Sequence, residues 1–428
     1  MDTIFAQATA QGRAGVCIVR ISGPQAFEIA EIIASPRPAA RQAVMRAIKD
    51  KTGSVIDHGL VLVFDGPNSF TGEDTVELHL HGSIAVVRAV LTELSTFAHT
   101  RIAEPGEFTR RAMENGKLDL TQVEGLGDLL EAETEAQRKQ ALRMLSGHLG
   151  KRVEIWREKL IRAAALLEVT IDFADEDVPV DVSSEVSSLL DDVGDDIIKE
   201  IKGTHTAERI RTGFEVAIIG RPNTGKSTLL NALAGRDAAI TSAVAGTTRD
   251  VIEVRMDLGG LPVILLDTAG LRESSDEVEA IGIERALSRA AQADLRVFLI
   301  EDGEGLPIEP RDDDISVLSK ADLRISSDGA ISGISGQGIS ELISRIQNVL
   351  NKRSLAAGLA THERHRVALQ KAADGLVAAK LVLDHGPDQY DIASDELRHA
   401  IRSLEVLVGR IDVENLLDVI FSSFCLGK

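Results

Sequence analysis

The stretch GRPNTGKS at residues 220–227 decides the fold of this chain. It matches the pattern G-x-x-x-x-G-K-[ST] and lies between an apolar run at 214–219, which predicts a strand, and a leucine-rich segment from Thr228, which predicts a helix. In such a turn backbone N–H groups surround phosphate oxygens, Lys226 neutralises the β- and γ-phosphates, and the Ser227 hydroxyl binds Mg²⁺. A chance glycine-rich turn would lack these flanking elements. The stretch therefore predicts a P-loop nucleotide-binding domain.

Two further motifs follow in the order found in GTPases, and each borders a predicted strand. They are GTTRD at 246–250 and DTAG at 267–270. In GTPases a threonine such as Thr248 completes Mg²⁺ coordination, an aspartate such as Asp267 holds the ion through water, and the Gly270 N–H senses the γ-phosphate. Each motif is weak alone, but together their order and spacing predict a GTP-dependent switch.

The base-reading motif is SKAD at 319–322, in the place of the Asn-Lys-x-Asp motif of GTPases. The Asp322 carboxylate can accept two hydrogen bonds from guanine, which favours GTP over ATP. Ser319 replaces the usual asparagine, whose amide would tie the loop to the P-loop and touch the base. The predicted nucleotide-binding residues are Asn223, Thr224, Gly225, Lys226, Ser227, Thr228, Ser242, Ala243, Val244, Ala245, Gly246, Thr247, Thr248, Asp267, Thr268, Ala269, Gly270, Ser319, Lys320, Asp322, Ser332, Gly333 and Ile334.

The hydrolytic machinery must differ from that of Ras-like proteins, because their water-positioning glutamine is replaced here by Leu271. Asn223 offers a neutral oxygen near the phosphates, and carbonyls or hydroxyls of residues 242–247 can complete a cage for a monovalent cation. Such a cation would place positive charge where an arginine finger otherwise acts. Glu279, in the acidic stretch 276–279, is the candidate for orienting water. A solvated charge at a helix start is the other interpretation.

The bulk composition narrows the remaining possibilities. At 428 residues, with 44% hydrophobic and 27% charged residues, the chain is expected to be a soluble globular protein of several domains. A net charge of −20 argues against general polyanion binding, so any RNA contact must be local. No membrane span and no signal peptide are visible. With Cys17 and Cys425 as the only cysteines, a reducing cytoplasm is the simplest location.

The domain organisation follows from changes in composition and hydrophobic periodicity along the chain. Residues 1–117 mix short strand-like runs with turns and predict an α+β domain, whereas 118–210 show helical periodicity, including an acidic helix pair after Pro179. Strands and glycine-rich loops alternate over 213–352, and helical periodicity returns over 356–428. We therefore expect a multi-domain α/β protein in which a Ras-like P-loop domain is inserted into an all-α domain and preceded by an α+β domain.

Four stretches outside the P-loop domain carry a family resemblance. They are residues 14–24 with IVRISGP at 18–24, residues 69–82 with SFTGED at 69–74, residues 105–120 with PGEFTR at 105–110 and NGKLDL at 115–120, and the tail FSSFCLGK at 421–428. With the nucleotide motifs, they make nearly the whole chain resemble the MnmE/TrmE family of tRNA-modifying GTPases. That family ends in Cys-x-Gly-Lys, whereas general P-loop GTPases do not.

The resemblance implies a homodimer formed through the N-terminal domains, with 5-formyl-tetrahydrofolate or 5,10-methylene-tetrahydrofolate bound near that interface. By position, Arg20, Glu77, Lys117 and Lys428 match the folate-binding residues of the family. Cations can pair with the carboxylates of a folate, and a carboxylate can accept from its ring N–H groups. Without the family, Arg20 and Lys117 would be interpreted as surface charges.

The resemblance also assigns the chemistry. It makes Asn223, Ser242, Val244 through its carbonyl, and Thr247 the potassium ligands of a potassium-stimulated GTPase, with Ser227 and Thr248 on Mg²⁺ and Glu279 as the water-orienting residue. The family works in a heterotetramer with a flavoprotein of the MnmG/GidA type. It forms aminomethyl or carboxymethylaminomethyl groups at C5 of the wobble uridine, position 34, of certain tRNAs, with one carbon from folate. Cys425 lies near that folate in a direct or positioning role, or else is a packed helix-end thiol.

Two alternatives stay open at the level of sequence. A ribosome-assembly or signalling GTPase would share the nucleotide motifs but would need neither a folate domain nor the Cys-x-Gly-Lys tail. A folate-dependent one-carbon transferase would use GTP only for regulation. The N-terminal and tail motifs favour tRNA modification over both.

Overall fold

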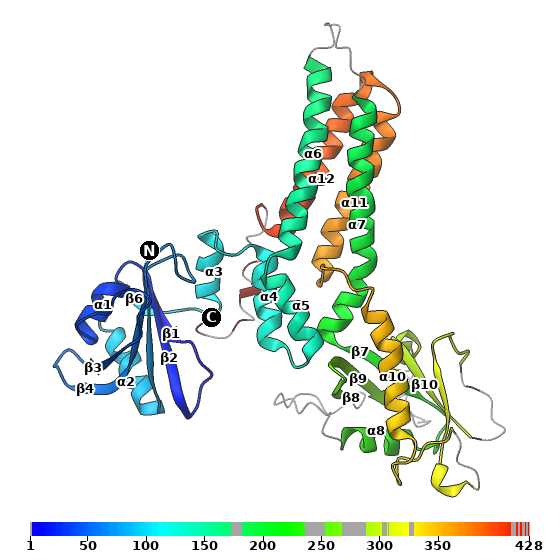
Figure 1. Ribbon diagram of the computed structural model, residues 1–428, viewed down its shortest axis with the longest axis horizontal. Helices are drawn as coiled ribbons and strands as arrows, with labels where there is room; N and C mark the ends of the chain where they lie inside the picture. Colours follow the sequence, from blue (N-terminus) through cyan, green and yellow to red (C-terminus); the bar gives the residue numbers. More distant parts are fainter. Residues whose placement is uncertain are drawn as a thin grey trace, which may run out of the picture. The chain divides into compact units, whose positions relative to one another are not determined.

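The computed structural model describes residues 2–172, 182–235, 253–267, 288–301, 306, 308–324, 329–411, 417, 420, 421, 424 and 427. The chain divides into two compact units (Figure 1). One comprises Met1–Gly127 with Val408–Lys428, and the other comprises Asp128–Leu407.

The first unit contains a six-stranded sheet in the order β3-β4-β5-β2-β1-β6. All neighbouring strands are antiparallel except β1 and β6, which are parallel. The helices of this domain are α1, α2 and α3. The bounds of these elements are β1 Thr3–Gln7, β2 Ala14–Ser22, α1 Ala26–Ile33, β3 Val44–Lys49, β4 Val55–Phe64, β5 Thr75–Gly82, α2 Ile84–Leu94, β6 Thr100–Ile102 and α3 Glu107–Glu114.

Strand alternation separates the core of this sheet from its polar face. In β2, Cys17, Val19 and Ile21 are buried together with residues of α1 and α2. Arg20 alternates with them and therefore points to the other face, where it pairs across the sheet with Glu77 of β5. This arrangement confirms the predicted α+β domain and places two charged side chains on the face opposite the main core.

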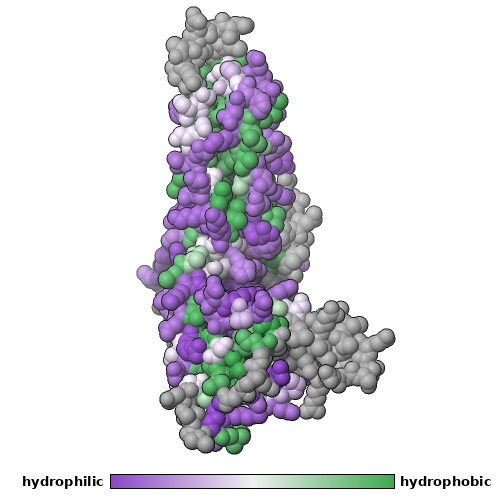
Figure 2. Space-filling model, turned by 90° about the vertical axis from the view of Figure 1, so that its right-hand side faces the viewer, coloured by the Kyte–Doolittle hydropathy of each residue, from purple (hydrophilic) through white to green (hydrophobic). Residues whose placement is uncertain are grey.

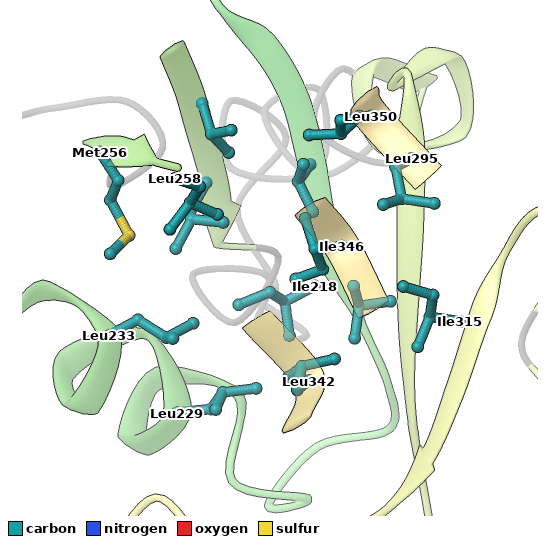
Figure 3. Close-up of a cluster of buried hydrophobic side chains, with 14 of the residues drawn as sticks. Ile218, Leu229, Leu233, Met256, Leu258, Leu295, Ile315, Leu342, Ile346 and Leu350 are labelled. Carbon is teal, nitrogen blue, oxygen red and sulfur yellow. The ribbon is translucent and has the colours of Figure 1, made fainter. Parts of the chain in front are cut away.

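The second unit contains a five-stranded sheet in the order β11-β10-β7-β9-β8. Strands β11, β10, β7 and β9 are parallel, and β8 is antiparallel to β9. Helices α8 and α10 bring leucines and isoleucines onto one face of the sheet, where they form the core shown in Figure 3. The bounds are β7 Phe214–Ile219, α8 Lys226–Ala234, β8 Glu253–Leu258, β9 Leu261–Asp267, β10 Leu295–Ile300, β11 Ile315–Leu318, η1 Ala321–Leu323 and α10 Ile339–Ser354.

Long helices on both sides of this P-loop domain in the sequence form one bundle (Figure 1). Helix α7 packs against α6, which precedes it, and against α11, which follows the whole P-loop domain. Figure 2 shows that the viewed face of the bundle is mostly hydrophilic, with hydrophobic residues interspersed. No helix in the described part of the chain is long and apolar enough to cross a membrane. The bounds are α4 Leu120–Glu131, α5 Glu135–Leu145, α6 His148–Asp172, α7 Ser183–Thr212, α11 Glu363–Leu383, η2 Pro387–Gln389 and α12 Tyr390–Val408.

The two ends of the P-loop domain lie side by side at the base of the bundle. Arg211, at the end of α7, donates from Nε to the Thr361 carbonyl at 3.2 Å, and the Gly358 N–H donates to the Gly203 carbonyl at 3.1 Å. The buried Glu200 carboxylate accepts the Ala360 N–H at 2.8 Å. Adjacent ends are what an inserted domain requires, so the predicted insertion into a helical domain is confirmed.

The predicted acidic helix pair is wrong over the described residues, because α7 is a single helix from Ser183 to Thr212. Gly203, in the interior of this helix, serves packing. A Cβ there would lie 2.5 Å from the Gly358 amide nitrogen. Helix α12 ends at Val408, where Gly409 takes a left-handed φ of 80°, and the described residues 417, 420 and 421 are again helical, in agreement with the helical periodicity toward the C-terminus.

Candidate functional site

The carboxyl ends of four parallel strands meet at one edge of the second sheet. The P-loop follows β7, Asp267 ends β9, Glu301 follows β10 and Ser319 follows β11. Strand β7 lies between β9 and β10, so the connections that follow it lead first to one side of the sheet and later to the other. Open α/β sheets bind ligands at the point where the strand order reverses in this way. The structure thus brings the predicted phosphate and base motifs to a single edge.

The P-loop wraps around the Lys226 side chain. This lysine is 6% exposed, and its Nζ donates to the carbonyls of Gly220 and Arg221 at 2.9 and 2.8 Å. Asn223 takes a left-handed φ of 65°, and Gly225, with φ 94°, is the residue before α8. The tight turn therefore places backbone N–H groups and the buried Lys226 ammonium at the N-terminus of α8, an arrangement that suits the binding of a phosphate chain.

The base-reading turn follows β11 directly. Ser319 is 1% exposed, and its hydroxyl donates to the Ile300 carbonyl at 3.3 Å. Lys320 has a left-handed φ of 59° and its Nζ lies 2.5 Å from Oε1 of Glu301. Asp322 is exposed on the single turn η1. Its carboxylate is therefore accessible to a base placed against this edge.

A second loop connects the base-reading turn to the P-loop helix. The Ala321 N–H donates to the Ile331 carbonyl at 3.0 Å. The buried Ser332 hydroxyl accepts the N–H groups of Ile334 and Ser335 at 3.2 Å each. Gly333 follows Ser332, and a Cβ at this glycine would lie 2.8 Å from the backbone of Thr228 in the first turn of α8. Only glycine allows this approach, which holds residues 332–334 beside the P-loop helix.

Part of the predicted nucleotide site lies outside the described residues. Asn223 and Ser227 are the predicted metal ligands that the structure describes, and Asp267 is described as the last residue of β9. In the described part of the chain, no group of three or more histidine, cysteine, aspartate or glutamate residues could hold a metal ion. The predicted residues outside the described ranges are Ser242, Ala243, Val244, Ala245, Gly246, Thr247, Thr248, Thr268, Ala269, Gly270 and Glu279.

A second candidate site lies on the polar face of the N-terminal sheet. Arg20 donates from Nε to Oε1 of Glu77 at 3.0 Å, and the two side chains are 17% and 16% exposed. The Arg20 guanidinium lies 5.4 Å from the centre of the Phe70 ring. His79 lies with Nε2 3.4 Å from Oε2 of Glu77. The sequence analysis did not single out His79, although its position two residues after Glu77 in a strand places both on one face.

Lys117 reaches the loop that carries Phe70. It is exposed after α3, and its Cε lies 3.3 Å from the position that a Cβ would take at Gly72. Since Gly72 lies two residues beyond Phe70, Lys117 and Arg20 contact neighbouring parts of one loop. The structure therefore gathers three of the four predicted folate-binding residues around that loop and the adjoining strands, and Lys428 lies outside the described residues.

The C-terminal tail packs within the first unit. Phe421 and Phe424 are buried against Val123, which lies in the early turns of α4. Gly427 is buried with φ 95°, and a Cβ there would collide with the Gln7 carbonyl at the end of β1. This contact holds the tail against the strand that neighbours β2.

Of the two cysteines, Cys17 lies within the described residues. Burial raises the pKa of the Cys17 thiol in the sheet core, with a smaller contribution from the Asp57 charge, so Cys17 is a poor nucleophile. Cys425 lies outside the described residues.

Comparisons with known proteins cover the whole chain. A family model described as "GTP-binding protein TrmE N-terminus" matches residues 3–117, and one described as "MnmE helical domain" matches residues 120–425. The tRNA modification GTPase MnmE of Roseobacter denitrificans is 64% identical, and that of Ruegeria pomeroyi is 62% identical, each over 100% of both chains. Among solved structures, Aquifex aeolicus Era bound to GDP and AlF₄⁻ is 24% identical, covering 38% of this chain and 67% of that chain with a TM-score of 0.24.

Proposed function

This chain belongs to the MnmE family of tRNA modification GTPases, and on that premise we propose that it couples GTP hydrolysis to modification of C5 of the wobble uridine, position 34, in certain tRNAs. The products would be aminomethyl- or carboxymethylaminomethyl-uridine. A flavoprotein of the MnmG/GidA type would be the partner, and a folate would supply one carbon.

The observation that carries this proposal is the packing of the tail on the N-terminal sheet. Gly427, two residues after Cys425, touches Gln7 of β1, and the adjoining Ala6 is paired with Arg20 of β2. Gly427 of the tail signature therefore lies against the strand that pairs with the strand of Arg20, one of the predicted folate residues. A GTPase that only assembles ribosomes or transmits signals would have no use for this arrangement.

The residues of the N-terminal sheet suit a folate. The Arg20 and Lys117 side chains supply cations for its carboxylates, and Glu77 supplies an acceptor for ring N–H groups. When bound, the folate supplies the one-carbon unit. We infer that the protein's own groups orient it, because Arg20 is already fixed between Glu77 and Phe70.

At the P-loop, Lys226 and the N-terminus of α8 would hold the phosphates, with Ser227 and Thr248 on Mg²⁺ and Asp267 acting through water. Asn223, in its left-handed turn, would contribute to a potassium site with Ser242, the Val244 carbonyl and Thr247. Potassium would supply positive charge beside the transferred phosphoryl group.

We propose that the protein works in the cytoplasm, where its tRNA substrate is found. The assembly would be a homodimer through the N-terminal domains, joined to the flavoprotein in a heterotetramer. The α+β domain at 1–117 would bind folate and form the dimer, and the P-loop domain would be an insert between helical segments.

The direct test is nucleoside mass spectrometry of tRNA from a strain that lacks this chain. We expect the C5-modified wobble uridines to disappear, because the modification requires this GTPase, and to return on complementation with the intact gene. A Lys226→Ala gene should not restore them, since the buried ammonium of the P-loop is lost. Normal wobble nucleosides together with abnormal ribosome profiles would contradict the proposal and support a role in ribosome assembly.

Hydrolysis should be faster in potassium than in sodium at equal ionic strength, because Leu271 cannot position water and Asn223 can ligate a cation.

Glu279→Ala should lower turnover by about 100-fold, the scale of a lost general-base or water-orienting group, while GTP affinity changes little. Phosphate release and equilibrium binding measure the two effects. Neighbouring Glu277→Ala is the matched control. A rate that ignores the cation, or a Glu279 variant with normal turnover, would require a different catalytic group.

A further inference from the structure

The base-reading turn is secured differently from the way its motif suggests. An asparagine at position 319 would tie the turn to the P-loop, but the Ser319 hydroxyl is buried and donates to the Ile300 carbonyl at 3.3 Å, inside the sheet. The Ser319 carbonyl instead accepts a hydrogen bond from Nε of Arg324 at 2.8 Å. Arg324 lies two residues beyond Asp322 and outside the SKAD motif.

This bond closes the turn on itself. Within the turn, the Leu323 N–H donates to the Lys320 carbonyl at 3.0 Å and the Arg324 N–H donates to the Ala321 carbonyl at 3.3 Å. The Arg324 side chain then returns to Ser319, so that the segment carrying Asp322 is bonded at both ends. Lys320 has a left-handed φ of 59°, which costs free energy for a residue with a Cβ, so the turn needs such support.

We propose that Arg324 is the positioning residue for guanine recognition in this chain. Its Nε–H holds the backbone of the turn that presents the Asp322 carboxylate, in place of an asparagine side chain at position 319. The inference rests on the proposed GTP site. The proposed role depends on the N–H at the Nε position, which donates to the Ser319 carbonyl.

Binding of GDP and IDP to the full-length protein tests this role, because IDP lacks the 2-amino group that Asp322 would accept from. We expect Arg324→Gln to weaken GDP binding about five-fold, the effect of one net hydrogen bond, and to weaken IDP binding less. The preference for GDP over IDP should therefore fall. Arg324→Lys should restore only a small part of it, since a lysine keeps the charge but has no N–H at the Nε position.

Ser319→Asn provides the second arm. We expect this substitution to tighten GDP binding, and in its background Arg324→Gln should cost about two-fold or less, because the asparagine amide again secures the turn. Arg345→Gln is the matched control. Arg345 also donates to a backbone carbonyl, that of Ser316 at 3.5 Å, but at the start of β11, away from the base-reading turn.

Several outcomes would overturn the inference. These are unchanged GDP affinity in Arg324→Gln, equal weakening of GDP and IDP, full restoration by lysine, or the same loss with serine and asparagine at position 319. Thermal unfolding of each variant separates a folding defect from a local effect, and we expect the midpoint of Arg324→Gln to match that of the control. If the protein without substitutions binds no GDP, the proposed GTP site itself is contradicted, and the role of Arg324 with it.

Discussion

Asp322→Asn is expected to reverse the base preference of this GTPase from GTP to XTP. The carboxylate offers two acceptor positions to the N1–H and 2-amino groups of guanine, whereas an asparagine amide presents one acceptor and one donor. The structure leaves Asp322 exposed on η1 at the nucleotide edge of the sheet. Loss of one hydrogen bond to a charged group costs about 1.5–3 kcal/mol, so GTP affinity should fall by about 10- to 150-fold.

Equilibrium binding and turnover with GTP and XTP measure this reversal. Asp388→Asn is a matched control, because Asp388 is also an exposed aspartate on a single-turn helix, η2, remote in sequence from every nucleotide motif. The control should keep the original preference. Unchanged GTP turnover in Asp322→Asn, with no gain on XTP, would remove Asp322 from base recognition.

Deletion of residues 425–428 is expected to abolish tRNA modification while GTP hydrolysis persists. The deletion removes Gly427, which packs on Gln7 of β1, together with Cys425 and Lys428. A thiol and an ammonium near a folate can act on it or orient it, and the terminal carboxylate adds a further partner. None of the nucleotide motifs lies in the tail, so the P-loop domain keeps its catalytic residues.

The measurement is paired: phosphate release, and modified wobble uridine formed together with the flavoprotein that we propose as the partner. Calorimetry with a folate should show weaker binding to the truncated protein. Cys425→Ala in the intact chain separates the thiol from the rest of the tail, since it keeps Gly427 and Lys428 in place. If the truncated protein modifies tRNA at the normal level, the tail contributes only packing.

The strand and the helix that flank the P-loop could be predicted to within two residues, because a glycine-rich turn between an apolar run and a leucine-rich run has few alternatives. The predicted strand at 214–219 is β7, and the helix begins at Lys226, within the motif. The α+β domain was also predictable, since period-2 alternation in β2 and β5 fixes which residues face the core.

Tertiary contacts explain what the sequence could not show. The acidic segment after Pro179 was predicted as a pair of helices, but α7 is one helix from Ser183 to Thr212, and its interior Gly203 is required by the close approach of Gly358. Arg324 lies outside every motif and His79 lies within the stretch 69–82 without a predicted role, and their roles depend on a carbonyl and a carboxylate that folding brings within reach.

The paired ends of the P-loop domain bear on how the nascent chain assembles. Helix α7 leaves the ribosome before the nucleotide domain, and its partner α11 follows that domain. Once the P-loop domain has folded, its two ends are held together by the contact between Arg211 and Thr361, so the domain is equivalent to a short connection between α7 and α11. Loop-closure scaling then lowers the entropic cost of joining α7 to α11 by about 3 kcal/mol. Folding of the inserted P-loop domain should therefore precede packing of α11 against α7. A variant that slows folding of the P-loop domain is expected to delay completion of the bundle.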